Sequence, residues 1–505
     1  MACAAVETPP VASSESPAYA RVGVAAAIFA VVSGLLLAFH ASRLIVSIDE
    51  GILFDAAQRI MRGQRLYVDF FSYFGPVSYW LQELAFRCFG LTLAAGRLVV
   101  ICDFGLQCAL LYWLIARFGH PRAAVAVTML FFLIEASNPV LLLAGHRWDS
   151  AALSLLAIMF CVEGWWIAGG VVMALAAFCT PTIGLIAVIS CVAARRNFWR
   201  FAAGMAAMTA AIVAALWAGG ILGGFVDRVL WLSHNYSAAN VTAYGWISGG
   251  WHEFMRGAAL PIRALLLLCT ELPALLPIAA ILGWSIVLLR QRTGHSRTII
   301  YLSACVAGYI VSAYPRPDIG HLTIIAPMGY ALFALLILGH IPSVGKFAFG
   351  GILPFALLSA IAAGGSLSGE TTLGTPVGNL RVDPQAKISF SRLLATVKPG
   401  DGLYVHPYLP LYYFLTQASN PTRYAYLGPG MMDERDEASV LADLEKSPPR
   451  WVLYTELSRE GFLRVFPSGK DGAFRFERIE TWIRTNYTSL PEPLRVSNYE
   501  LLQRK

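Results

Sequence analysis

Long apolar runs separated by short polar breaks constrain this chain more than any other feature. An apolar stretch of about 18 residues or more can cross a bilayer as a helix. Only 14% of the residues are charged, against about 25% in soluble domains. We therefore expect a polytopic α-helical membrane protein with about 11 transmembrane helices. The apolar runs, some of them short, are 22–40, 93–116, 122–138, 149–163, 166–180, 182–194, 199–220, 262–289, 298–314, 321–340 and 346–363.

The composition becomes that of a soluble domain after about residue 365. The segments 400–407 and 450–456 are rich in β-forming residues, and 437–446 is an amphipathic helical stretch between them. Strand, helix and strand in this order predict a small C-terminal α/β domain. No glycine-rich nucleotide fingerprint follows either β-rich segment. The predicted parts are a disordered tail (1–21), a transmembrane domain (22–365) and this soluble domain (366–505).

The basic residues indicate an orientation in the membrane. If the N-terminus is cytoplasmic, the inner loops are 117–122, 163–166, 195–200, 290–297 and 341–346, and four of these five carry Lys or Arg. This agrees with the positive-inside rule, so the net charge of +7 needs no nucleic-acid partner. The first outer loop (41–92), the later polar clusters and the soluble domain then share the outer side.

The segment 77–90 is the exception on which this orientation depends. If it crossed the membrane, every later loop would change sides and the arginine-rich loops would lie outside. Glu83 and Arg87 interrupt it, so we predict a helix that lies in the interface instead.

The first outer loop carries the acids that we expect to do chemistry. Asp49 and Glu50 lie near the start of this loop, where carboxylates can deprotonate a nucleophile or help to hold a metal. Alternatively, Ser47 and Asp49 only begin a helix. We predict Asp49, with Glu50, as catalytic. Asp69 is either a further acid of the site or a turn residue, and we expect Tyr73 to line the cavity.

A second polar cluster, Gly145 to Asp149, lies at the outer end of an apolar run. Its aromatic and charged side chains can form an ordinary interfacial belt with a snorkelling arginine. The other interpretation is that His146, Arg147 and Asp149 face the same cavity as Asp49. The sequence leaves both open.

A third cluster, YPRPDIGH at 314–321, concentrates Arg316, Asp318 and His321 between two apolar runs. An arginine can bind phosphate with two parallel hydrogen bonds, and a histidine can add a donor. We predict Arg316 and His321 as phosphate-binding residues, with Asp318 lining the cavity. The alternative is a tight turn in which Arg316 pairs with Asp318.

Several of these motifs together resemble a known superfamily. They are DEG at 49–51, YVDFFSYFGPVSYW at 67–80, FG at 89–90 with Arg97, RPDIGH at 316–321, and the tyrosine-containing segments at 404–415, 421–427 and 481–487. This pattern resembles GT-C glycosyltransferases, which include protein O-mannosyltransferases and bacterial aminoarabinose transferases. The resemblance covers most of the chain, although each motif is short.

The resemblance implies a bacterial inner-membrane enzyme that transfers a sugar, with inversion, from a polyprenyl-phosphate carrier to a glycan, lipid or protein acceptor. Transfer would occur at the periplasmic face, with Asp49 as the base. The segment that matches the family's Lys-Pro-Pro is Phe74-Gly75-Pro76, so the lysine that would contact the carrier phosphate is missing. Arg316 and His321 are its expected substitutes. Some relatives hold a divalent cation, but this sequence does not require one, and no other cofactor is implied.

Two other classes of protein compete with this interpretation. A transporter or flippase of lipid-linked sugars should show internal repeats and helices broken near the midplane. The sequence has no such repeat, and its polar residues gather at one surface. A non-catalytic assembly subunit would not need Asp49, Glu50, Arg316 and His321.

Overall fold

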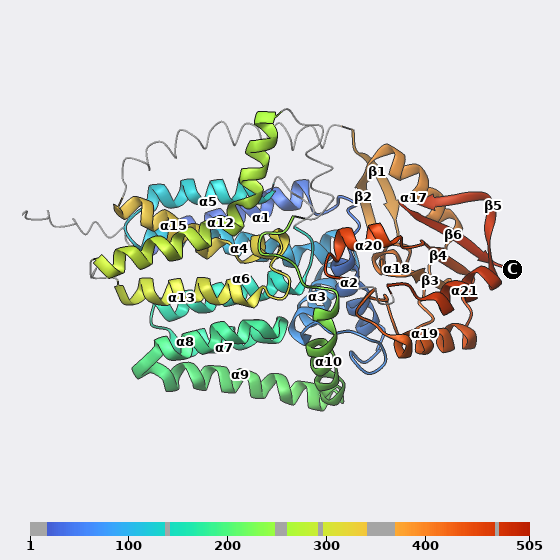
Figure 1. The fold of residues 1–505 in the computed structure, drawn as a ribbon, viewed down its shortest axis with the longest axis horizontal. Helices are drawn as coiled ribbons and strands as arrows, with labels where there is room; N and C mark the ends of the chain where they lie inside the picture. The colour runs from blue at the N-terminus through green and yellow to red at the C-terminus, as the bar shows by residue number, and fades with distance from the viewer. Residues whose placement is uncertain (1–17, 137–141, 248–259, 291–295, 341–368, 470–473) are drawn as a thin grey trace, which may run out of the picture.

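The computed structural model describes residues 18–136, 142–247, 260–290, 296–340, 369–469 and 474–505. Most of the chain forms a bundle of roughly aligned helices, coloured blue to yellow in Figure 1, and the orange to red C-terminal part lies against one end of it. We call this end of the bundle the domain end. The bundle helices are α1 (Ala18–Phe39), α4 (Leu93–Arg117), α5 (Pro121–Ala136), α6 (His146–Val162), α7 (Trp166–Cys179), α8 (Gly184–Ala194), α9 (Phe198–Ala218), α12 (Leu260–Arg290), α13 (Ser296–Ser312), α14 (Ile319–Ile325) and α15 (Pro327–His340).

Within the described residues, four helical segments are long and apolar enough to cross a membrane: Tyr19–Phe39, Leu93–Arg117, Pro181–Ala218 and Thr270–Arg290. A fifth is added if α14 and α15, which meet at 66°, form one bent span. The chain is therefore a multi-pass membrane protein, but the expected count of about 11 spans is not confirmed. The helices α7 and α13 are apolar but shorter, and the predicted span 346–363 lies outside the described residues.

Three further helices lie at the domain end: α2 (Ile48–Met61), α3 (Pro76–Phe89) and α10 (Leu222–Asn235). Both ends of α3 are fixed there. The Gly75 N–H before it donates to the Cys179 carbonyl at 3.2 Å, and the Leu93 N–H after it donates to the Val377 carbonyl at 3.1 Å. The helix α3 therefore starts and finishes on one side of the bundle, as an interfacial helix would.

The C-terminal part is an α/β domain, as predicted. Its main sheet has the strand order β3-β4-β6-β5, in which β3 and β4 are parallel and β6 is antiparallel to both of its neighbours. A separate hairpin joins β1 and β2. The elements are β1 (Thr371–Thr375), β2 (Gly378–Val382), α17 (Pro384–Thr396), β3 (Leu403–His406), α18 (Leu411–Thr416), α19 (Glu434–Lys446), β4 (Trp451–Tyr454), α20 (Arg459–Val465), α21 (Glu477–Asn486), β5 (Tyr487–Val496) and β6 (Tyr499–Arg504).

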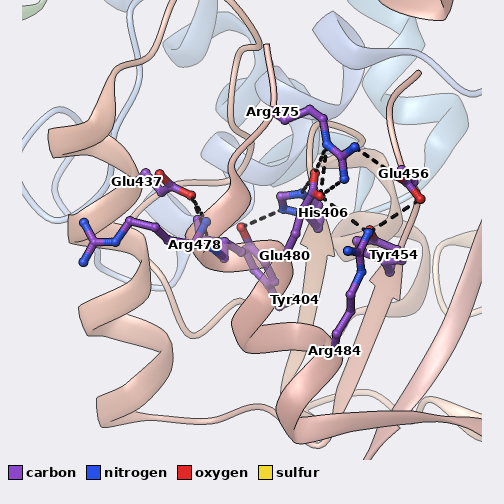
Figure 2. Close-up of polar contacts among 10 residues, drawn as sticks. Tyr404, His406, Glu437, Tyr454, Glu456, Arg475, Arg478, Glu480 and Arg484 are labelled. Atoms are coloured by element: carbon purple, nitrogen blue, oxygen red, sulfur yellow. Dashed lines mark hydrogen bonds and ion pairs between the residues drawn. The ribbon is translucent and has the colours of Figure 1, made fainter. Parts of the chain in front are cut away.

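A network of charged side chains fixes α21 and the loop before it against the sheet of this domain (Figure 2). Arg475 pairs with Glu480 and, at 2.9 Å, with Glu456, while Arg484 reaches Glu456 at 3.6 Å. His406 Nε2 lies 3.8 Å from Glu480. Burial would raise the pKa of Glu480, but bonds from His406 and Arg475 outweigh it and hold the pKa at about 2. Because burial lowers the pKa of His406, the arginines supply the positive charge at neutral pH.

The domain is attached directly to the loop that follows α1. The Leu44 N–H donates to the Arg381 carbonyl at 2.8 Å, and Arg43 pairs with Glu370 at 2.6 Å. The helices α2 and α18 touch so closely that a Cβ atom at Gly51 would lie 2.3 Å from the Leu411 nitrogen. Only glycine fits there, which explains the third residue of the DEG motif.

Candidate active site

A cavity between the bundle and the C-terminal domain has a volume of about 490 Å³. It gathers residues from the segment between α1 and α3, the start of α6, the turn before α14 and the C-terminal domain. Seven of the residues predicted from the sequence line it: Asp49, Tyr73, His146, Arg147, Arg316, Asp318 and His321.

A second cavity, of about 300 Å³, adjoins the first. It shares Asp49, His146, Arg147 and His321 with the first cavity, and α10 contributes apolar side chains such as Leu232 to its wall. Asp49 therefore lies where two chambers meet, so a group bound in either chamber can approach its carboxylate.

Asp49 lies in the first turn of α2, one residue after the helix begins. The helix N-cap is Ser47, whose side chain makes no capping hydrogen bond. Within the described part of the chain, the Asp49 carboxylate has no hydrogen bond or ion pair, and its side chain is exposed to the cavity. A helix start alone does not account for an unpaired carboxylate turned toward a polar chamber.

The groups around Asp49 have opposing effects on the pKa of its carboxyl. Its position deep in the fold raises its pKa, Arg147 and Arg316 lower it, and Asp318 raises it, with a net upward shift. Because the side chain is open to the cavity, this burial acts less strongly than full enclosure in apolar material would. The carboxylate therefore remains able to ionise and to accept a proton.

Arg316 is already occupied by protein groups. Its guanidinium donates to Asp318 at 2.7 Å, to the Asn240 side chain at 2.9 Å and to the Val465 carbonyl at 2.9 Å, and it stacks on Phe466 at 5.2 Å. It therefore clamps the turn before α14 to the C-terminal domain. The turn alternative, in which Arg316 pairs with Asp318, describes this geometry well.

Arg147 also lines the cavity, but the described protein groups do not hold its guanidinium as they hold that of Arg316. It lines both chambers, and its guanidinium has no ion pair or hydrogen bond within the described ranges. Its charge also acts on Asp49, lowering the pKa of that carboxyl. An unpaired guanidinium in a cavity is suited to bind an anion.

The two histidines of the cavity are held by neighbouring side chains. His146 Nδ1 lies 2.8 Å from the Thr180 hydroxyl, and its ring stacks on Phe74 at 4.1 Å. His321 Nδ1 lies 2.6 Å from Asp318, which also caps α14 by accepting the His321 N–H. These contacts fix both rings at the cavity wall.

Glu50 faces away from the cavity and into the protein. Its carboxylate receives two hydrogen bonds of 2.8 Å from Arg97, and both side chains are fully buried. Arg97 also donates to the carbonyls of His40, Arg43 and Ile45. This pair joins the loop before α2 to α4, so it holds the backbone that carries Asp49.

Two further predicted residues also lie away from the cavity. Asp69 pairs with Arg65 at 3.0 Å on the surface, as a turn residue does. Asp149 is buried beside Asp103 of α4 and Ser78 of α3.

The structure adds residues that the sequence did not identify. Tyr408, Tyr426 and Phe466 of the C-terminal domain and Tyr236 and Asn240 after α10 complete the cavity wall. For the residues of the C-terminal domain, the signal in the sequence was the density of tyrosines at 404–427. Among the described residues, no group of three or more His, Cys, Asp or Glu side chains is placed to hold a metal ion.

Comparison with known proteins identifies the fold. No family model matches the sequence, and neither does any curated protein. ArnT from Cupriavidus metallidurans, solved with bound undecaprenyl phosphate, is similar with a TM-score of 0.52 and 13% identity, over 96% of this chain and 97% of that one. The Archaeoglobus fulgidus oligosaccharyltransferase, solved with zinc and sulfate, gives 0.50 and 12% over 86% and 67%. The predicted GT-C fold is thus confirmed.

Proposed function

We propose that this chain is an inverting glycosyltransferase that moves a sugar from a polyprenyl-phosphate carrier to a cell-envelope glycan, lipid or protein. The observation that carries the proposal is the shared cavity, in which an unpaired carboxylate (Asp49) lies beside an unpaired guanidinium (Arg147) at one end of a membrane bundle. A transporter would place such groups near the middle of the spans. The similar ArnT structure contains a polyprenyl phosphate, which supports the class of donor.

The reaction needs one base and one group that stabilises the leaving phosphate. An acceptor hydroxyl attacks the anomeric carbon, and its proton passes to the Asp49 carboxylate. The bond between that carbon and the carrier phosphate breaks, and the phosphate oxygen keeps the electron pair. A positive charge near this oxygen stabilises the transition state. No nucleotide site is needed, because the leaving group is a lipid phosphate.

We assign the carrier phosphate to Arg147, with His146 and His321 as neighbouring donors. The sequence favoured Arg316 with His321, but Arg316 already has three hydrogen-bond acceptors and a stacking partner. Binding phosphate there would break the clamp on the C-terminal domain. Arg147 can bind the anion without losing a contact that the structure describes.

We further propose that the cavity opens at the periplasmic face of the inner membrane and that the N-terminus is cytoplasmic. Arg195 and Arg196 lie in the turn between α8 and α9, at the end of the bundle away from the C-terminal domain (Figure 1). The positive-inside rule assigns that end to the cytoplasm.

The direct test supplies the purified protein, in nanodiscs, with a polyprenyl-phosphate sugar and follows release of the free lipid phosphate. We expect release in the wild type and almost none in an Asp49 variant. No release with any donor, together with movement of labelled carrier across vesicle membranes, would favour the flippase.

The rate of transfer is expected to fall at acidic pH. A general base must be ionised, so activity declines as the pH drops through the pKa of Asp49, which is raised above the ordinary value of 3.8. Arg147 lowers that pKa, so the residual activity of Arg147→Gln should decline at a higher pH than that of the wild type. A profile of kcat/KM against pH measures this shift, with the surface variant Arg65→Gln as the control. An unchanged acid limb in Arg147→Gln would contradict the electrostatic coupling.

Replacing Arg147 by glutamine should weaken binding of undecaprenyl phosphate about 10- to 100-fold, because a hydrogen bond to a charged group contributes about 1.5–3 kcal/mol. The affinity of Arg147→Lys should lie between those of the wild type and Arg147→Gln, since lysine keeps the charge but loses the bidentate geometry. Equilibrium binding of the lipid in detergent measures the effect. Normal affinity in Arg147→Gln would return the assignment to Arg316.

A further inference from the structure

A furrow on the surface between α8 and α9 is separate from the two cavities described above. Its volume is about 610 Å³, and its walls include Val188 and Val192 of α8 and Phe198 and Met205 of α9. Val188 and Val192 are 59% and 74% exposed. The furrow is therefore an apolar depression on a surface that belongs to a membrane-spanning segment, where acyl chains are the surrounding solvent.

One end of this furrow is strongly basic. Arg195 lines it, and Arg196 and Arg200 follow within the next five residues. All three side chains are exposed. The sequence has no acidic residue between Glu163 and Asp227. Glu163, in the loop between α6 and α7, is already paired with Arg117 at 2.8 Å.

Apolar walls that lead to uncompensated guanidinium groups suit a molecule that has both an acyl chain and an anionic group. We propose that this furrow binds an anionic glycerophospholipid, with an acyl chain along α8 and the phosphate on Arg195 and Arg196. Guanidinium groups bind phosphate oxygens with paired hydrogen bonds, and basic pockets between membrane helices bind anionic headgroups. Trp199, 78% exposed, is an aromatic residue of the kind found at headgroup level.

The arginines alone have a simpler explanation, because basic loops also orient a protein without binding a particular lipid. The furrow distinguishes binding of a particular lipid from this general effect of basic loops. General attraction to a negative surface depends on the total charge at this end of the bundle, whereas a bound lipid depends on the two arginines at the furrow and on the apolar wall beside them.

The test measures retention of phosphatidylglycerol and phosphatidylcholine on the purified full-length protein by native mass spectrometry over a lipid titration. We expect the wild type to bind phosphatidylglycerol at least tenfold more tightly. Arg195→Gln/Arg196→Gln should lose this preference. The control Arg122→Gln/Arg290→Gln removes the same charge from exposed residues that do not line the furrow, and it should keep the preference.

A further variant tests the apolar wall. Val188→Trp adds bulk at an exposed furrow position, so it should weaken retention of both lipids at least fivefold without disturbing the helix core. Equal retention of the two lipids by the wild type would overturn the proposal. An equal loss of the preference in both arginine double variants would also overturn it, because surface charge alone would then explain the binding. Displacement of the lipid by soluble glycerol phosphate at the same concentration would overturn it as well.

Discussion

Asp49→Asn is expected to reduce glycosyl transfer by about 10²- to 10⁴-fold, the usual contribution of a positioned general base. The amide has nearly the same shape but cannot take the proton of the acceptor hydroxyl. Because the carboxylate faces the cavity and has no described partner, its loss should not lower the thermal unfolding temperature. Release of lipid phosphate in nanodiscs, with unfolding followed on the same preparation, measures both quantities.

The segment between α1 and α3, which carries Asp49, also provides the matched control. Asp69 belongs to the same loop but pairs with Arg65 on the surface, so Asp69→Asn should keep near-normal activity. If Asp69→Asn were as inactive as Asp49→Asn, the loop would act as a whole and the assignment to Asp49 would be wrong. Near-normal activity of Asp49→Asn would also show that the assignment to Asp49 is wrong.

Arg97→Gln is expected to destabilise the folded protein by about 3–5 kcal/mol, because it leaves the fully buried Glu50 carboxylate without its charged partner. The loop before α2 also loses the donor for its His40, Arg43 and Ile45 carbonyls. The variant should therefore unfold at a lower temperature and lose transfer, since the backbone that carries Asp49 is no longer held.

Two comparisons separate this effect from a general sensitivity to charge. Arg87 pairs with Glu83 on the surface at 2.7 Å, and such pairs contribute about 0–1 kcal/mol, so Arg87→Gln should be nearly neutral. Removing both members of the buried pair, in Glu50→Gln/Arg97→Met, should be less harmful than Arg97→Gln alone. If the double variant were the less stable, the unpaired carboxylate would not be the cause.

The sequence was sufficient for the features that depend on local patterns. Apolar length identified the membrane bundle, and the alternation of β-rich and helical segments identified the C-terminal α/β domain. Proline spacing and polar density marked the turn that carries Arg316, Asp318 and His321, and all three line the cavity.

Features that depend on distant contacts could not be read in this way. Asp49 and Glu50 are adjacent and chemically alike, yet successive helical residues point about 100° apart, and Glu50 is the one that meets Arg97 in the protein interior. Arg316 looked like a free phosphate ligand because its partners Asn240 and Val465 lie far away in the sequence. The count of about 11 spans is not confirmed, because several bundle helices in the described part of the chain are short.

The clamp between Arg316 and the C-terminal domain has a consequence for how the protein is made. Synthesis proceeds from the N-terminus, and domains fold as units in that order. The bundle therefore forms while the cavity still lacks the wall formed by Tyr408, Tyr426 and Phe466. Only after the ribosome has passed Val465 does Arg316 gain its carbonyl acceptor. A chain that ends before Val465 therefore has an Arg316 without this acceptor and a cavity without its C-terminal wall.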